Sequence, residues 1–302
     1  MTEFLRIKSI SQLNEMLGYE KPKHPLITII DYSKVTANPE HYDVKIVTDF
    51  YIISLKSPAP NSLQYGKQYY DFEEGTMMFM SPEQVFSVSN FNESIQYKGW
   101  GLYIHPDLIS NTSLGQKIKE YTFFSYSVSE ALHISQDEKQ TLTDLIKIIE
   151  KEYKANLDQF SQNLIVTAIE QLLNYSQRFY QRQFLTRQKL NTDFISRFEQ
   201  LVTSYFQSNQ LKESGLPTVD YFANKLNLSP SYLTDLLKKE IGKTTKEYLQ
   251  IELMEKAKYR LLNSNDTVNE IAYSLGFEYP QYFNRLFKSK IGMTPMEFRN
   301  DN

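Results

Sequence analysis

The feature that most constrains this 302-residue chain is an internal repeat in its last third. The segment 230–238 (PSYLTDLLK) aligns with the segment 280–288 (PQYFNRLFK), about fifty positions later. The alignment continues downstream at Ile241-Gly242 and Ile291-Gly292, and upstream at Ala223 and Ala272 with one residue inserted. A repeat of this length predicts two copies of one supersecondary unit.

Each copy has the pattern of a helix-turn-helix. A small alanine allows two helices to approach closely, and Asn227 or Gly276 follows at a position suited to the left-handed conformation of a tight turn. A second helix then begins at Pro230 or near Pro280, because proline fits the first turn of a helix. We expect helix-turn-helix units at about residues 219–240 and 267–290.

The second helix of each unit has a polar face opposite its apolar one. Hydroxyl, amide and guanidinium groups suit hydrogen bonding to base edges and phosphates in a DNA major groove. The connecting helix, near residues 245–262, would be about 27 Å long, close to the rise of one DNA turn. We predict that the DNA-contacting residues are Ser231, Tyr232, Thr234, Asp235 and Lys238 in the first unit, and Gln281, Tyr282, Asn284, Arg285 and Lys288 in the second.

The main alternative is that the helix pairs bind protein. The chain would then be a ligand-modulated protein-interaction module without DNA specificity. Duplication of the unit with its turn chemistry preserved favours DNA binding over this alternative.

The first 110 residues follow a different pattern. Short runs alternate apolar and polar residues between turn signals, which predicts an antiparallel β-sandwich or barrel over about residues 20–110. The predicted strands are Leu26–Asp31, Phe50–Leu55, Thr76–Met80, Val85–Ser89 and Gly101–Ile104.

From about residue 135 the apolar spacing becomes helical. Ser135 and Glu138 have capping-box spacing, and two long amphipathic helices are expected over about residues 135–183. The stripe from Phe160 to Phe179 on the second helix is nearly a heptad pattern. Two interpretations that do not exclude each other are that it packs on the chain's own sheet and that it packs against the same stripe of another copy. A boundary near 180–192 separates a domain at 1–185 from one at 192–302.

Composition excludes several classes of protein. Without cysteine the chain has no disulfide, thiolate zinc site or cysteine nucleophile. Its four histidines, His24, His41, His105 and His133, form no H-x-H pair, and Glu73-Glu74 is more typical of a solvated turn than of a metal site. We expect no catalytic residue, cofactor or metal; a metal-dependent cupin enzyme with a DNA-binding tail is the weaker alternative.

Charge is distributed unevenly along the chain. The overall net charge of −3 argues against a nucleic-acid partner. However, residues 178–302 contain 18 basic and 14 acidic side chains, a net +4, which leaves 15 and 22, a net −7, for residues 1–177. The second half is therefore permissive for DNA binding. The start of the chain has no signal-peptide pattern and no apolar run approaches the ~20 residues that span a bilayer, so we expect a cytoplasmic protein without membrane contact.

One stretch of the second unit carries a family signature. It runs from 271 to 288 (IAYSLGFEYPQYFNRLFK) and is followed by Gly292-Met293-Thr294-Pro295 and Phe298-Arg299. This region, from near 195 to 299, resembles the AraC/XylS-type transcriptional regulators. The resemblance implies double-stranded DNA and RNA polymerase as partners, with base or phosphate contacts from both second helices. Asp235 is acidic where a contact is expected, so the second unit is expected to contribute more.

The resemblance also implies a role for the first half. In that family a cupin-like β-barrel senses a small-molecule effector and the following helices form a homodimer. The fold class expected is therefore α+β multidomain, with a cupin-like antiparallel barrel, a helical segment and an all-α double helix-turn-helix. No effector-binding residue is assigned. Aromatic residues near Tyr51, Tyr65, Tyr69, Phe79 and Tyr103 are either pocket-lining or ordinary core.

Overall fold

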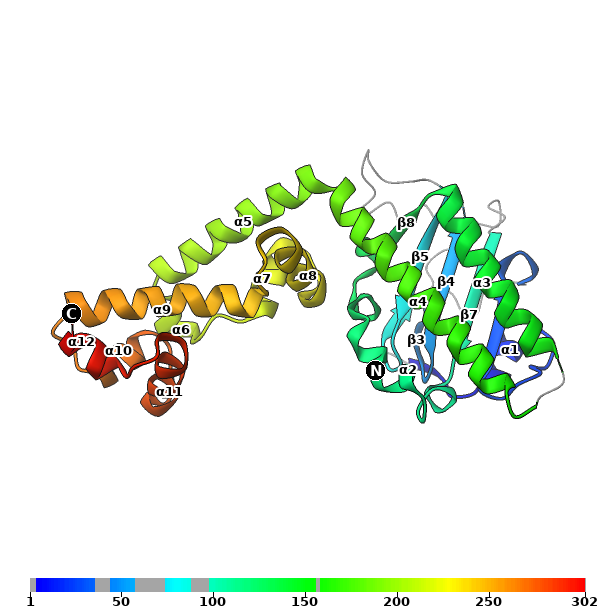
Figure 1. Ribbon diagram of the computed structural model, residues 1–302, viewed down its shortest axis with the longest axis horizontal. Helices are drawn as coiled ribbons and strands as arrows, with labels where there is room; N and C mark the ends of the chain where they lie inside the picture. The colour runs from blue at the N-terminus through cyan, green and yellow to red at the C-terminus, as the bar shows by residue number, and fades with distance from the viewer. Residues whose placement is uncertain (1–3, 36–43, 58–73, 88–97, 156–157, 302) are drawn as a thin grey trace. The chain divides into compact units, whose positions relative to one another are not determined.

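The computed structural model describes residues 4–35, 44–57, 74–87, 98–155 and 158–301 (Figure 1). The chain divides into two compact units, Met1–Arg187 and Gln188–Asn302. Within the ranges described, no helix combines the length and apolar character needed to cross a membrane.

The first unit contains two β-sheets. An antiparallel five-stranded sheet has the order β2-β7-β4-β5-β8, and a three-stranded sheet has the order β1-β3-β6, with β1 and β3 parallel. The larger sheet consists of β2 (Ile27–Asp31), β4 (Tyr51–Ser57), β5 (Gly75–Met80), β7 (Lys98–Ile104) and β8 (Leu132–Ile134); the smaller consists of β1 (Phe4–Ile7), β3 (Lys45–Thr48) and β6 (Val85–Ser87).

Sheets are present where strands were predicted, but a closed barrel is not shown. Each of the five predicted strands exists, whereas β1, β3 and β8 were missed because runs of three or four residues are too short to display a period. Among the described residues neither sheet closes, since β2 and β8 remain separate edges of the larger sheet. The helical elements of this unit include α1 (Ile10–Met16), η1 (Tyr32–Lys34), α2 (Ser113–Lys117), η6 (Thr122–Ser125), α3 (Gln136–Lys154) and α4 (Ser161–Thr186).

The larger sheet has two differently covered faces, because successive side chains of a strand point to opposite sides. One face carries Phe79, whose ring centroid lies 6.0 Å from that of Tyr180 on α4. On this side α3 and α4 lie together across the sheet (Figure 1). The opposite face carries Ile52 and Tyr103, which form a buried cluster with residues of α1 and the smaller sheet.

Most of the apolar stripe of α4 packs within its own unit. Ala168, Leu172 and Phe179 are 6 %, 0 % and 8 % exposed, which agrees with the first of the two interpretations of the stripe. At its start, Phe160 and Leu164 remain exposed.

The end of α4 completes the outer edge of β8. His133 N donates to Gln183 Oε1 at 2.7 Å, and Gln183 Nε2 donates to Ala131 O at 3.1 Å. Arg182 Nη2 donates to His133 O at 2.7 Å and to Glu138 Oε2 at 2.6 Å. Side chains of a helix thus take the place of a further strand, which protects the edge from pairing with other chains.

Glu138 also belongs to the capping box that was predicted at the start of α3. Its backbone N–H donates to Ser135 Oγ at 3.3 Å, and its carboxylate accepts from Ser135 N at 3.0 Å. The ion pair with Arg182 therefore connects the start of α3 to the end of α4.

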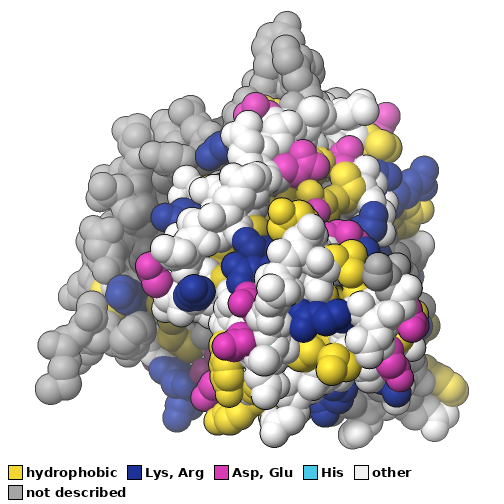
Figure 2. All heavy atoms as spheres, turned by 90° about the vertical axis from the view of Figure 1, so that its left-hand side faces the viewer, with side chains coloured by type: hydrophobic (Ala, Val, Ile, Leu, Met, Phe, Trp, Pro, Cys, Tyr) yellow, Lys and Arg dark blue, Asp and Glu magenta, His cyan; other side chains and the backbone are white. Residues whose placement is uncertain are grey.

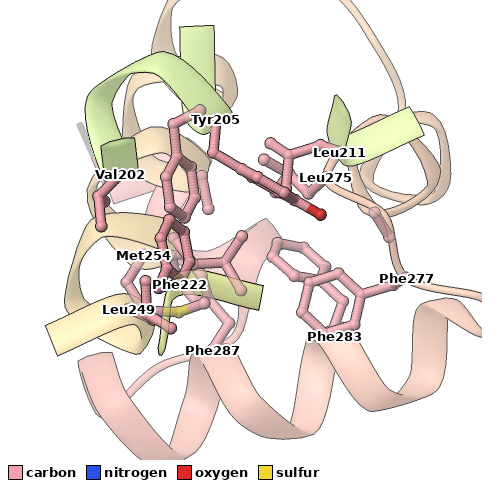
Figure 3. Close-up of a cluster of buried hydrophobic side chains, with 14 of the residues drawn as sticks. Val202, Tyr205, Leu211, Phe222, Leu249, Met254, Leu275, Phe277, Phe283 and Phe287 are labelled. Atoms are coloured by element: carbon pink, nitrogen blue, oxygen red, sulfur yellow. The ribbon is translucent and has the colours of Figure 1, made fainter. Parts of the chain in front are cut away.

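The second unit is entirely helical among its described residues. Its core contains the fully buried rings of Phe222, Phe283 and Phe287 (Figure 3). The ring of Phe198 belongs to the same buried cluster. The helices are α5 (Gln188–Gln207), α6 (Gln210–Ser214), α7 (Val219–Leu226), α8 (Pro230–Ile241), α9 (Thr245–Asn263), α10 (Val268–Ser274), α11 (Pro280–Ile291) and α12 (Pro295–Asp301).

Gly276 permits a close backbone contact in this unit. Its φ is +85°, and a Cβ there would lie 2.5 Å from Leu211 O and 2.8 Å from the carbonyl carbon of Gly215. Gly242, which ends α8 at φ +73°, has no atom within 4 Å of the same position. An alanine at Gly242 would therefore have only the cost of the left-handed backbone conformation, whereas an alanine at Gly276 would also overlap with neighbouring backbone atoms.

We expect Gly276→Ala to destabilise the chain more than Gly242→Ala does. Both substitutions force alanine into the left-handed region at about 1–2 kcal/mol, and Gly276→Ala adds about 1–3 kcal/mol of overlap with backbone. Urea unfolding followed by circular dichroism measures the difference. Equal losses for the two variants would show that the contact at Gly276 is not tight.

Candidate DNA-binding surface

The two helix-turn-helix units have the same turn geometry. In the first, Asn227 adopts φ +57° and Leu228 N donates to Ala223 O at 2.9 Å. In the second, Gly276 adopts the corresponding conformation and Phe277 N donates to Ala272 O at 3.1 Å. Both alanines are fully buried, so the predicted left-handed turns and close helix approach are confirmed.

Helix α9 joins the two units. Its 19 residues make it about 28 Å long. One face is buried through Leu249, Leu253 and Ala257. Because this helix belongs to the same core as α7 and α10, it spaces the two units by direct packing.

Capping interactions define the starts of three helices here. Glu247, Glu270 and Glu297 each accept a hydrogen bond from the backbone N–H of a threonine three residues earlier, at 2.8, 2.7 and 2.7 Å. These backbone N–H groups lower the pKa of all three carboxyls, since they stabilise the charged form. The spacing Thr-x-x-Glu was visible in the sequence, and it positions α9, α10 and α12.

The predicted residues of α11 lie on one accessible face. Gln281, Tyr282, Arg285 and Lys288 are exposed and Asn284 is partly exposed. The guanidinium carbon of Arg285 lies 5.3 Å from the ring centroid of Tyr282, whose ring in turn meets that of Tyr279 edge-on. The cation–π contact holds the guanidinium on the outer side of the helix.

The predicted residues of α8 are less accessible. Lys238 is exposed, while Ser231, Thr234 and Asp235 are only partly so. The Thr234 hydroxyl donates to Pro230 O at 2.8 Å and lies 3.3 Å from the hydroxyl of Thr245. Its hydrogen-bonding capacity is thus partly used within the unit.

Tyr232 does not belong to the polar face, which corrects the prediction. Its side chain is 3 % exposed, whereas the aligned Tyr282 is 54 % exposed. On α8, Leu236 lies four residues after Tyr232 and is buried beside it on the helix surface, so the apolar face extends over Tyr232. On α11 only Phe283 and Phe287 are buried, which leaves Tyr282 outside.

Side chains of both charges are interspersed on the surface seen in Figure 2. Lysine and arginine alternate there with aspartate, glutamate and apolar groups, without one continuous basic area. This agrees with the small net charge of +4 counted for residues 178–302. We therefore expect only a modest long-range attraction of DNA, so that short-range contacts contribute a larger share of the binding free energy.

The remaining candidate residues that the structure describes do not form a metal site. Among the described residues, no three His, Asp or Glu side chains are grouped so that they could hold a metal ion. Of the aromatic candidates, Phe79 packs between sheet and helices, and Tyr51 meets Phe124 edge-on. His41, Glu73, Tyr65 and Tyr69 lie outside the described residues.

Two helix-turn-helix units, of which the second presents an exposed polar helix, define a helix-turn-helix DNA-binding domain. Comparison with known proteins agrees: residues 222–301 match the family model described as a helix-turn-helix domain.

Relatives extend this match. The uncharacterized HTH-type transcriptional regulator YfiF of Bacillus subtilis (strain 168) is 25 % identical over 237 residues, which are 78 % of this chain and 72 % of YfiF. The Msm operon regulatory protein of Streptococcus mutans is 36 % identical over 83 residues, which are 28 % of this chain and 30 % of that protein. A solved C-terminal domain of the response regulator yesN from Fusobacterium nucleatum is 32 % identical, covering 34 % of this chain and 95 % of that one, with a TM-score of 0.31. On the family match and the curated relatives, the chain is a DNA-binding transcription regulator with an AraC-type helix-turn-helix domain at residues 222–301.

The aligned tyrosines of the two units are expected to respond differently to truncation. Tyr232→Ala removes a buried ring and should lower the free energy of unfolding by about 3 kcal/mol, while Tyr282→Ala should change it by less than about 0.5 kcal/mol. Thermal and urea unfolding of both variants test this. A large loss of stability in Tyr282→Ala would mean that its ring is part of the core.

Proposed function

We propose that this chain binds a specific sequence of double-stranded DNA, with α8 and α11 entering successive stretches of the major groove. The observation that carries the proposal is the exposed polar face of α11. The turn before α11 has the same geometry as the turn before α8. The length of α9, about 28 Å, is close to one turn of DNA. The proposed contacts are Ser231, Thr234, Asp235, Lys238, Gln281, Tyr282, Asn284, Arg285 and Lys288.

In this proposal α11 reads more of the sequence than α8 does. Gln281 and Arg285 are exposed donors of the kinds that recognise adenine and guanine edges. On α8 the Thr234 hydroxyl is already bonded to Pro230 O, and Asp235 repels phosphate unless it accepts from a cytosine amino group. We therefore assign to α8 a larger share of positioning contacts through Lys238.

We further propose a domain organisation that follows the resemblance. Residues 1–185 form a cupin-like sensor with a helical dimerisation segment, and 192–302 form the DNA-binding domain. The exposed Phe160, which precedes α4, and Leu164 in its first turn support an interface with a second copy, because large apolar side chains are seldom left in water together. In this proposal the protein is a cytoplasmic homodimer that binds a small-molecule effector. Effector binding changes how the two copies present their helices to paired DNA sites, and this alters the recruitment of RNA polymerase. No enzymatic step is part of this mechanism.

The contribution of Arg285 is the central test. A binding-site selection with the full chain on random DNA duplexes identifies the sequence to be used as the probe. Gel shifts with this probe over a series of salt concentrations then measure the affinity and its dependence on salt. We expect Arg285→Ala to weaken binding about 5- to 100-fold and to relax the preference at one base position, or to reduce the salt slope by about 1 if the contact is to phosphate.

The matched control is Lys147→Ala on α3, which removes the same charge from the first unit. It should leave affinity and slope unchanged. If Arg285→Ala behaved like Lys147→Ala, α11 would not be the recognition helix; if no sequence were enriched in the selection, sequence-specific binding itself would be wrong.

A further inference from the structure

Lys56 on β4 carries an ammonium group for which the described residues provide no acceptor. Among the described residues, no carboxylate and no hydrogen-bond acceptor pairs with its ammonium group, and its recorded contact is the ring of Tyr32, 5.4 Å from Nζ to the centroid. The side chain is only partly exposed, and burial lowers the pKa of the ammonium because the charged form loses water. A charge in this position is costly unless something compensates it.

Thr76 stands directly beside Lys56 on the same face of the sheet. The two residues are cross-strand partners in the register of β4 and β5, which places their Cβ atoms about 5 Å apart. Thr76 is 1 % exposed, and its Oγ1 has no hydrogen-bond partner in the part of the chain that the structure describes. Two neighbouring polar groups, an ammonium and a buried hydroxyl, are therefore unsatisfied together.

More hydroxyl groups continue this face of the sheet. Tyr32 is hydrogen-bonded to the Ser54 side chain, and its hydroxyl oxygen lies 3.4 Å from that of Tyr103. The positions opposite Ser54 and Lys56 on β7 are Gly101 and Gly99, which contribute no side chains. The Tyr32 ring covers Gly101, where an added Cβ would lie 2.3 Å from the Tyr32 hydroxyl oxygen.

We propose that this face, defined by Lys56, Thr76 and Tyr32, binds a small anion with a carboxylate or phosphate group. An ammonium can only donate hydrogen bonds, and the threonine hydroxyl has a proton to donate, so the complementary ligand is an acceptor. A negatively charged acceptor satisfies the Lys56 charge as well as the Thr76 hydroxyl, and charge-assisted hydrogen bonds are the stronger kind.

One residue of the proposed site, Thr76, lies one strand from the sheet edge that α4 binds. His133 is the cross-strand partner of Thr76, and its backbone N and O are the groups bound by Gln183 and Arg182. The last residue of the first unit, Arg187, follows five residues after Arg182. If the anion is the effector of the regulator, that role rests on the proposed function. The binding of an anion at this face does not depend on it.

The test measures thermal unfolding of the full chain in sodium phosphate, sodium butyrate or sodium chloride at equal ionic strength. Phosphate or butyrate should raise the midpoint above that in chloride, since a ligand of the folded state stabilises it. Lys56→Met and Thr76→Val should unfold at a higher temperature than the parent in chloride, because each removes an unsatisfied buried group. Lys56→Met should weaken anion binding in titration calorimetry about 10- to 100-fold.

The matched control is Lys147→Met, an exposed lysine on α3 that should retain the full anion effect. The proposal is overturned if neither phosphate nor butyrate exceeds chloride, or if Lys56→Met and Lys147→Met respond alike. A gel shift of the same variants separates this result from the proposed function, since loss of anion binding with intact DNA binding concerns the anion site alone.

Discussion

The close approach of two helices at a buried alanine is the constraint on which the C-terminal unit depends. At Ala223 and again at Ala272, the next turn is left-handed and a backbone hydrogen bond returns from the residue after it. Because each turn directs the following helix into the common core, Phe283 and Phe287 face inward and the opposite side of α11 faces solvent. The exposed polar surface is thus a consequence of packing beneath it.

The same constraint acts on two sequences with different results. Asn227 makes the first turn, while the second requires Gly276, because the backbone around Gly215 packs against it. The apolar face of α8 is wider than that of α11, so Tyr232 is buried where Tyr282 is exposed. A duplicated fold has thereby provided one helix with a large accessible face and another with a restricted one, which supports the division of roles proposed for them.

In the N-terminal unit, one edge of the larger sheet is hydrogen-bonded to α4, while two polar side chains of the same sheet are unpaired among the described residues. Arg182 and Gln183 occupy the backbone edge of β8 and join it to the helix that leads toward the second unit. On the face of the same sheet that carries Ile52 and Tyr103, Lys56 and Thr76 have no acceptor among the described residues. Proteins seldom leave buried polar groups unpaired, and where they do the cause is often functional. Here Thr76 lies one strand and Lys56 two strands away from the edge that α4 binds.

Helix starts, helix caps and turns could be predicted from the sequence because they depend on interactions between residues only a few positions apart. Proline at the start of α8, threonine and glutamate three residues apart, and glycine or asparagine at a turn have the same effect wherever they occur, so the helix-turn-helix repeat and the capping box at Ser135 could be predicted. Contacts between distant segments could not. The burial of Tyr232, the pairing of β1 with β3 and the cross-strand neighbours of Lys56 depend on rotation, register and the strands that lie alongside. Periodicity assigns a residue to a face, but only tertiary packing decides whether that face meets a core, another strand or solvent.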